Sequence, residues 1–187
     1  MLSVTDGEKS FEQFLSGDKE AFSGVIDCYR EGLIFFVYGY THNMYLAEDI
    51  ASESLAELYL SPKRFLHKSS LKTYLYSIAY RKAMKILKKN AYLQELDLGV
   101  LDNKTDEYSS FEDKVLKDEQ ARQLHNALPK LKSEYRTALM LIYFEDMSYK
   151  EAAAVMHKTV KQIDNYLLRG KAALKKLLSE EGFEYEE

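Results

Sequence analysis

The sequence reads MSYKEAAAVMHKTVKQIDNYLLRG from residue 147 to residue 170. This stretch contains two capping-box signatures, Ser148 with Glu151 and Thr159 with Gln162. In a capping box, a hydroxyl and a side-chain carbonyl oxygen each accept a backbone N–H at the start of a helix. Two such helices joined by a tight turn form a helix-turn-helix. We therefore predict a helix-turn-helix here, with a basic surface hairpin of two helices as the alternative.

The second helix of this motif is expected from Val160 to about Leu178, with Ile163 and Leu167 facing inward. The preceding turn has His157 in place of the usual glycine, and histidine adopts a positive φ less readily than glycine. Outward residues are polar near the helix start and basic further along, which suits contacts with base edges and phosphates. The candidate duplex-DNA contacts are Thr159, Lys161, Gln162, Asp164, Asn165, Leu168, Arg169 and Lys171.

Charge is distributed unevenly along the chain, although the net charge is only −4. Residues 1–60 hold three basic and eleven acidic side chains, whereas residues 61–90 hold nine basic side chains and no acidic one. Residues 158–176 are again basic, with six cations and one carboxylate. Two basic blocks separated by acidic sequence indicate two separate contacts with a polyanion. The alternative is two solvated helix faces.

The first basic block also contains four aromatic residues, Phe65, Tyr74, Tyr76 and Tyr80. Cations alternating with rings suit single-stranded nucleic acid, because bases stack on the rings while phosphates pair with Lys or Arg, at roughly 1–3 kcal/mol per stacked base. For Tyr76 and Tyr80, a place in the protein core is an equal alternative.

Apolar residues upstream recur with the helical period of three to four positions. A capping box at Ser10–Gln13 predicts one helix start, and further helices are expected over 18–40, 45–60 and 71–90. Residues 91–111 are acidic and weakly periodic, and no strand-like alternation of useful length is found. We predict an all-α protein of two small helical domains, 1–90 and 112–182, joined by a flexible acidic linker at 91–111, with the helix-turn-helix in the second domain.

Several classes of protein are disfavoured by the composition. No run approaches the roughly 18 apolar residues of a membrane helix, and the first residues do not resemble a secretory signal, so we expect a cytoplasmic protein without membrane insertion. The single cysteine, Cys28, excludes an internal disulfide and a cysteine-based zinc site. Since no His-Glu-x-x-His, phosphate loop or nucleophile–base pattern is found, we expect no enzyme activity, cofactor or metal.

Several short motifs together resemble a known family. Ala47-Glu-Asp-Ile50 with Glu53, followed by Leu71-Lys-Thr-Tyr-Leu-Tyr-Ser-Ile-Ala79 and a lysine-rich helix end, is similar to region two of bacterial sigma factors. Ala127-Leu-Pro-Lys-Leu131, Tyr135-Arg136, the segment 147–153 and the segment 163–170 resemble region four. The resemblance covers about residues 10–90 and 112–178. This short two-domain form is similar to the extracytoplasmic-function group, which binds core RNA polymerase and directs promoter recognition, DNA opening and transcription initiation.

The resemblance implies roles for particular residues. An acidic helix face would dock on the clamp helices of the largest polymerase subunit, through Glu48, Asp49, Ser52 and Glu53. The loop 66–71 would hold a base flipped out of the minus-ten element, and the helix 72–89 would face the separated strands. The implied contacts are Lys63, Arg64, His67, Lys68, Ser69, Ser70, Lys72, Tyr74, Arg81, Lys82 and Lys85. The helix 160–171 would enter the major groove of the minus-thirty-five element.

The implied partners are core RNA polymerase, promoter DNA and an anti-sigma factor. The acidic linker would either imitate nucleic acid in polymerase channels or merely aid solubility. The sequence departs from the family at Tyr74, where tryptophan is usual, at Tyr80-Arg81 in place of Arg-Asn, and at Gln162-Ile163 and Asn165 in the recognition helix. The alternative function is a helix-turn-helix regulator that binds duplex DNA without polymerase, which leaves the basic aromatic block at 62–90 unexplained.

Overall fold

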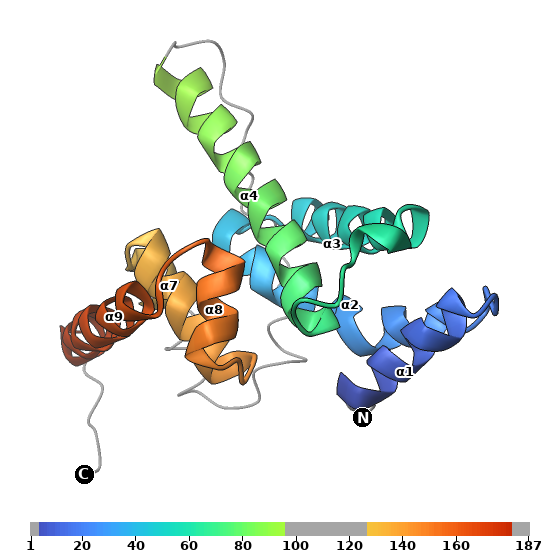
Figure 1. Cartoon of the computed structure of the whole chain (residues 1–187). Helices are drawn as coiled ribbons and strands as arrows, with labels where there is room; N and C mark the ends of the chain where they lie inside the picture. Colours follow the sequence, from blue (N-terminus) through green and yellow to red (C-terminus); the bar gives the residue numbers. More distant parts are fainter. Residues whose placement is uncertain (1–3, 96–126, 181–187) are drawn as a thin grey trace. The chain divides into compact units, whose positions relative to one another are not determined.

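A computed structural model of the 187-residue chain describes residues 4–95 and 127–180. The chain divides into two compact units, Met1–Thr105 and Asp106–Glu187. Every regular element in the described residues is a helix (Figure 1), which confirms the all-α prediction. Within these same two ranges, no helix combines the length and hydropathy needed to cross a bilayer.

The first unit is built around a central helix, α2 (Phe22–Thr41). Helices α1 (Val4–Leu15), α3 (Met44–Leu60) and α4 (Leu71–Glu95) all pack against it, and α3 also packs against α4. Each buried large apolar side chain contributes roughly 1.5–3 kcal/mol relative to its exposed state. The largest fully buried side chains of this unit come from all four helices: Phe11, Leu33, Phe36, Ile50, Leu58, Leu71, Leu75, Tyr76 and Ile78.

The predicted helix start at Ser10 is wrong, because Ser10 lies inside α1. The position faces α2 where the two helices come close: a β-carbon added at Gly24 would lie only 2.3 Å from Ser10 Oγ. The hydroxyl therefore serves close helix packing and does not cap a helix. Asp18 caps the next turn instead, since its Oδ1 accepts the backbone N–H groups of Glu20 (3.0 Å) and Ala21 (3.3 Å).

Helix α4 begins with two side-chain acceptors at its first turn. Ser70 Oγ accepts the N–H of Thr73 at 3.2 Å, and Glu8 Oε1, from α1, accepts the N–H of Leu71 at 3.3 Å. A helix start leaves backbone N–H groups unsatisfied, so both bonds stabilise it. The helix then continues to Glu95, beyond the predicted end at Asn90 and into the predicted linker. The rest of that linker, and the start of the predicted second domain as far as residue 126, lie outside the described residues.

The second unit contains a short 3₁₀ turn, η2 (Leu128–Lys130), followed by α7 (Ser133–Leu139) and a π-helical turn, η3 (Met140–Phe144). Helices α8 (Tyr149–Met156) and α9 (Val160–Glu180) complete it, and α9 packs against both α7 and α8. Gly170 allows the close approach of α9 to α7, because a β-carbon there would lie 3.2 Å from atoms of both Tyr135 and Leu139. The core of the unit is formed by Met140, Leu141, Val155, Met156, Ile163 and Leu167.

Candidate nucleic-acid interface

The connection between α8 and α9 has the geometry of a helix-turn-helix. At the start of α8, Glu151 N–H donates to Ser148 Oγ (3.3 Å), and Ser148 N–H donates to Glu151 Oε2 (2.9 Å). The same reciprocal pair starts α9: Gln162 N–H donates to Thr159 Oγ1 (3.2 Å), and Thr159 N–H donates to Gln162 Oε1 (2.9 Å). Both predicted capping boxes, and the helix-turn-helix that they imply, are therefore confirmed.

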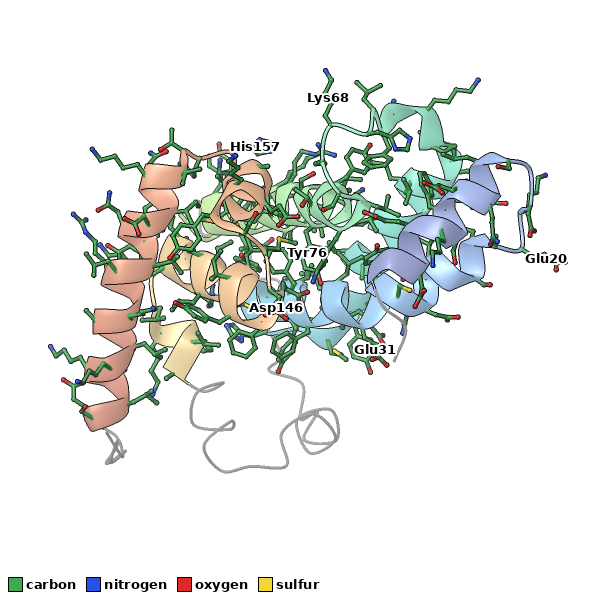
Figure 2. All side chains as sticks on the ribbon, turned by 60° about the horizontal axis from the view of Figure 1, so that its bottom comes forward. Glu20, Glu31, Lys68, Tyr76, Asp146 and His157 are labelled. Atoms are coloured by element: carbon green, nitrogen blue, oxygen red, sulfur yellow. The ribbon has the colours of Figure 1, made fainter. Side chains whose placement is uncertain are left out.

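His157 ends α8 in the left-handed conformation, with φ 52° and ψ 47°. Its backbone N–H lies within hydrogen-bonding range of the carbonyl oxygens of Ala153 and Ala154, which closes the last turn of α8. Histidine thus occupies the position that usually has glycine, as the sequence predicts. Figure 2 shows its side chain at the surface of the second unit.

All eight predicted duplex-DNA contacts lie on the exposed side of the α9 segment, while Ile163 and Leu167 are buried. Leu168 is 70% exposed, which leaves an apolar side chain available for the methyl group of a thymine. Two amide side chains of this surface, Gln162 and Asn165, already make hydrogen bonds within the protein. Gln162 uses its carbonyl oxygen in the capping box, and Asn165 Nδ2 donates to the carbonyl oxygen of Lys161 at 3.0 Å. Gln162 is therefore left with its two N–H donors, and Asn165 with its carbonyl oxygen and one N–H donor. This difference between the two amides cannot be read from the sequence.

Lys171 is also held by a neighbouring side chain. Its Nζ lies 4.8 Å from the centre of the Tyr143 ring, an arrangement typical of a cation–π contact. A side-chain hydrogen bond with Tyr143 raises the pKa of Lys171. The ammonium group stays charged at neutral pH, and its position is set by an exposed ring of η3.

The acidic face predicted for polymerase binding lies on one side of α3. Asn43 Oδ1 caps this helix by accepting the N–H of Leu46 at 2.9 Å. The four predicted residues are exposed or half-buried, whereas the opposite side of α3 is buried in the unit: Ala47, Ile50, Ala51, Ser54, Leu55 and Leu58. Glu48 is paired with Arg30 of α2 at 3.6 Å.

A groove of about 630 Å³ runs beside this acidic face, between α2 and α3. Ser52 and Arg30 line it together with mainly apolar side chains, among them Phe22, Ile26, Leu55 and Tyr59. Ile26 and Tyr59 are 37% and 40% exposed. This groove could not be predicted from the sequence, because Ile26 and Tyr59 fit the helical apolar pattern equally well as core residues.

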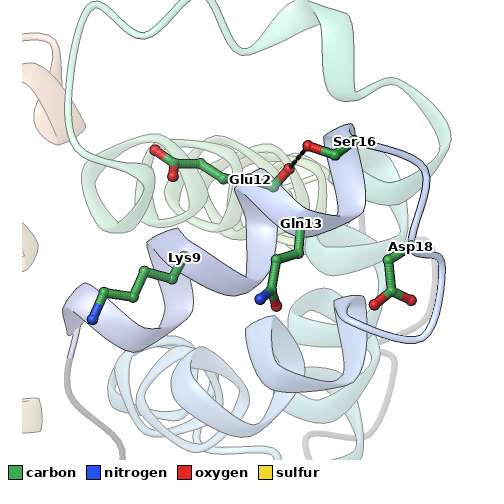
Figure 3. A pocket seen from close by; sticks show the side chains of 5 residues that line it. All are labelled: Lys9, Glu12, Gln13, Ser16 and Asp18. Atoms are coloured by element: carbon green, nitrogen blue, oxygen red, sulfur yellow. Dashed lines mark hydrogen bonds between the residues drawn. The ribbon is translucent and has the colours of Figure 1, made fainter.

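A second hollow, of about 470 Å³, lies on the polar side of α1 (Figure 3). It is lined by Lys9, Glu12, Gln13, Ser16 and Asp18, and Ser16 Oγ donates to the carbonyl oxygen of Glu12 at 2.9 Å. It contains none of the predicted site residues. Within the described residues, no group of three or more His, Cys, Asp or Glu side chains is arranged to bind a metal ion.

The loop between α3 and α4 presents most of the predicted minus-ten contacts to solvent. A 3₁₀ turn, η1 (Pro62–Arg64), exposes its two cations, and His67 follows with φ 54°. Lys68 projects away from the ribbon in Figure 2. Beneath the loop, the buried ring of Phe65 lies 4.5 Å from His67 and 5.2 Å from Tyr74, measured between ring centres. Phe65 therefore anchors the loop and is not a free stacking platform.

The aromatic residues of α4 are divided between core and surface. Tyr76 is 1% exposed, and its ring centre lies 5.1 Å from that of Phe36, so of the two alternatives for Tyr76 the place in the core is confirmed. Tyr80 is half-buried beside Tyr40. Tyr74 keeps part of its ring at the surface; burial raises its pKa, and the carboxylate of Glu57 raises it further.

Two of the predicted DNA-binding cations of α4 are paired with carboxylates of α3. Arg81 Nη2 lies 3.2 Å from Glu57 Oε1, and Lys82 Nζ lies 3.1 Å from Glu53 Oε2 and 3.4 Å from Glu57 Oε2. The family resemblance implies that Glu53 contacts polymerase and Lys82 contacts DNA, on separate surfaces. The structure brings the two side chains into direct contact.

Each of the two units matches a region of one known protein family. The family model of sigma-70 region 2 matches residues 25–92, and that of sigma-70 region 4 matches residues 121–174. The chain is 27% identical over 179 residues to the ECF RNA polymerase sigma factor SigW of Bacillus subtilis, covering 91% of this chain and 96% of SigW. It is 26% identical over 186 residues to the RNA polymerase sigma-H factor of Pseudomonas aeruginosa, covering 95% and 96%.

Two solved structures show the same fold. The sigma factor RpoE of Bartonella quintana, in complex with the anti-sigma factor NepR, has a TM-score of 0.65 and 21% identity, over 84% of this chain and 96% of that one. CnrH, in complex with the cytosolic domain of CnrY, has a TM-score of 0.67 and 20% identity, over 93% and 97%.

The match to region 2 over residues 25–92 accounts for the basic aromatic block that a stand-alone helix-turn-helix regulator leaves unexplained. The matches to regions 2 and 4, together with the two sigma-factor relatives, favour a sigma factor over a helix-turn-helix regulator that acts without polymerase. The chain belongs to the extracytoplasmic-function group of the sigma-70 family, the sigma factors that bind core RNA polymerase and direct promoter recognition, DNA opening and transcription initiation.

Proposed function

We propose that the acidic face of α3 and the adjoining α2–α3 groove together form the polymerase-docking surface. A stable interface combines an apolar centre, which is buried on binding, with a polar rim. The groove supplies apolar side chains from α2 and α3, and Glu48, Asp49, Ser52 and Glu53 supply the rim. Carboxylates at the rim accelerate encounter with a basic partner surface and restrict its orientation.

The loop 61–70 and the outer side of α4 are the proposed contacts with the opened minus-ten element. The supporting observation is that Phe65 fixes the loop from beneath while Lys63, Arg64, His67 and Lys68 remain exposed above it. Capturing an unstacked base offsets the few kcal/mol needed to extrude it from the duplex. Strand opening therefore needs binding energy and no covalent chemistry, and we assign the protein no catalytic activity and no cofactor.

Helix α9 is the proposed reader of the minus-thirty-five element. Its N-terminus carries Lys161, Gln162 and Asn165 on the exposed side, and Arg169 follows further along. The N-terminal residues of a recognition helix contact base edges, while cations contact phosphates and set the register. Since the carbonyl oxygen of Gln162 is used within the protein, Gln162 is expected to donate to a base. Asn165 keeps its carbonyl oxygen and one N–H, so it can both accept from a base and donate to one.

Regulation by an anti-sigma factor is a further part of the proposal. The RpoE relative with the same fold is in complex with the anti-sigma factor NepR. An inhibitor of this kind would occlude the α3 face or the loop 61–70. We place the protein in the cytoplasm, because core polymerase and promoter DNA are its partners there.

The observation that carries this proposal is the pairing of an exposed acidic helix face with an apolar groove in the same unit. The decisive experiment combines the purified chain with bacterial core polymerase and measures both complex formation and promoter-specific transcripts. The double substitution Asp49→Arg, Glu53→Arg should weaken the complex by about 100-fold, equivalent to about 2.7 kcal/mol.

The matched control is Glu12→Arg, Glu31→Arg, which makes the same change of charge at exposed positions of α1 and α2. It should bind polymerase like the original chain. Unchanged affinity of the Asp49→Arg, Glu53→Arg variant, with its helical content intact, would contradict the docking assignment.

A further inference from the structure

The ion pairs between α3 and α4 form one connected network. Glu53 and Glu57 are one helical turn apart on α3, and Lys82 of α4 lies between their carboxylates at 3.1 and 3.4 Å. Arg81 adds the third pair, with Glu57 at 3.2 Å. We call these four residues the α3–α4 ion-pair network.

The two ends of the network differ in exposure. The side chains of Lys82 and Glu57 are each 25% exposed, whereas those of Glu53 and Arg81 are 65% and 58% exposed. The inner pair is thus shielded, and the two outer groups can be reached by other molecules. No ion pair to another described residue is found for Lys85, which lies further along α4.

Two carboxylates beside two cations leave this part of α4 with little net charge. A DNA phosphate that approaches Arg81 or Lys82 must compete with Glu53 and Glu57 and is repelled by both. A surface ion pair changes an equilibrium by only a few-fold, so the network can be opened by a ligand of moderate affinity. The charge of the Glu57 carboxylate also adds to the raised pKa of Tyr74, the partly exposed ring of α4.

We propose that Glu53 and Glu57 hold Arg81 and Lys82 in the free chain, and that polymerase binding to Glu53 leaves Lys82 held by Glu57 alone, which makes the release of Lys82 to DNA easier. This inference rests on the proposed function, since it takes Glu53 as a polymerase contact and Lys82 as a DNA contact. The network then joins the two surfaces through a single shared pair. By linkage, any gain in DNA affinity caused by polymerase is matched by an equal gain in polymerase affinity caused by DNA.

The first test measures DNA binding by the free, full-length chain. The probe is a short fluorescent single-stranded oligonucleotide, titrated at several salt concentrations. Glu57→Gln removes one carboxylate charge but keeps a side-chain oxygen and nearly the same shape. It breaks the pairs with Arg81 and Lys82, but Lys82 still has Glu53, so Arg81 is the cation that is freed. Affinity should increase about 2- to 5-fold at low salt, the range expected for a surface ion pair, and the salt dependence should steepen by about 0.7 in the logarithmic slope.

The control for net charge is Glu31→Gln on the exposed side of α2, which should leave the oligonucleotide affinity nearly unchanged. A second control repeats Glu57→Gln in an Arg81→Gln, Lys82→Gln background, where the gain should disappear because the cation it frees is missing. A gain that persists in this background, or a loss of affinity in Glu57→Gln itself, overturns the inference.

The second test measures polymerase binding without DNA. Lys82→Gln frees Glu53 from its intramolecular partner, so the affinity for core polymerase should increase about 2- to 5-fold. Lys9→Gln, which removes one cation from an exposed position of α1, should have no effect. Equal polymerase affinity of the Lys82→Gln variant and the original chain overturns the release step.

The outcomes also separate this inference from the proposed function. If the Arg81→Gln, Lys82→Gln pair does not change DNA affinity in either background, α4 is not a DNA-binding surface, and the proposed function itself fails at that point. If these cations do contribute to DNA binding but Glu57→Gln has no effect, the proposed function stands and the α3–α4 ion-pair network is only structural.

Discussion

Among the helices of residues 4–95 and 127–180, α4 and α9 are the two basic ones, yet they present their charge differently. In α4, Arg81 and Lys82 are paired with carboxylates of the neighbouring α3. In α9, the pair Lys176–Glu180 lies within the helix at 3.8 Å, and no ion pair to another described residue is found for Lys161 or Arg169. The number of basic residues in a helix therefore does not tell how much of the charge is available to DNA.

The two helices also differ in how much of them is buried. Helix α4 contacts both α2 and α3 and contributes Leu75, Tyr76 and Ile78 to the core. Helix α9 buries a narrower stripe, including Ile163 and Leu167, and leaves Leu168 exposed. We interpret α4 as both a structural and a binding element, and α9 mainly as a binding element. The predictions below test this contrast.

The largest expected effect is on the stability of the first unit. Tyr76→Ala should lower the free energy of unfolding by about 3–5 kcal/mol, because it leaves a cavity against Phe36 and removes a fully buried ring. Urea unfolding followed by circular dichroism measures this change. Tyr92→Ala, in the same helix but at a position that is 60% exposed, and Leu168→Ala in α9 should each change stability by less than about 0.5 kcal/mol.

The next effect concerns DNA affinity. Arg169→Gln should weaken duplex binding by the free chain about 5-fold and lower the salt slope by about 0.9, as expected for the loss of one phosphate contact. Arg81→Gln should have a smaller effect on binding of a single-stranded oligonucleotide, the ligand proposed for α4, since its guanidinium is already paired with Glu57. Equal losses in the two variants would remove the distinction between α4 and α9.

The third prediction compares the side-chain caps at the starts of α9 and α4. Thr159→Ala should destabilise the second unit by about 1 kcal/mol, because the N–H of Gln162 loses its acceptor. Thr159→Ser retains the hydroxyl and should be nearly neutral. Ser70→Ala should cost less at the start of α4, where Glu8 still accepts the N–H of Leu71. Thermal unfolding of the three variants provides the comparison.

The smallest effect is a gain in stability at the turn of the helix-turn-helix. His157→Gly should stabilise the second unit by about 0.5–1 kcal/mol, since the residue has φ 52° and glycine adopts this conformation without steric cost. His67→Gly, at φ 54° in the loop before α4, tests the same reasoning in the first unit. A lower melting temperature for His157→Gly would show that the imidazole has contacts that outweigh the backbone strain.

The sequence predicts local features of this fold well and contacts between helices poorly. The capping boxes at Ser148 and Thr159 were predictable because each depends on residues only three positions apart. The same signature at Ser10 failed because a contact with Gly24 on another helix determines how that residue is used. Helical periodicity likewise could not place Tyr76 in the core, since that depends on α4 packing against two helices at once.

In the candidate site, too, local features could be predicted from the sequence and contacts between helices could not. Each predicted contact of α9, and each residue of the acidic α3 face, lies exposed or half-buried on the side expected from the helical period. The α2–α3 groove and the Glu53–Lys82 pair could not be predicted, because they join residues far apart in the chain whose distance is fixed only by helix packing. The partial occupation of Gln162 and Asn165 depends on side-chain conformations that a sequence pattern does not specify.

The first N–H of α4 donates a hydrogen bond to Glu8, a residue that lies before the region 2 match. The region 2 unit therefore depends on residues outside the matched range. The family match begins at residue 25, whereas Glu8 belongs to α1 (Val4–Leu15). A protein shortened to the matched region would lose this carboxylate, as well as Phe11, whose ring lies 5.8 Å from Phe65 beneath the loop 61–70. The loop that we propose to face the promoter would then lose both contacts with α1. On this proposal, a ligand that binds α1 could change DNA opening without contacting DNA.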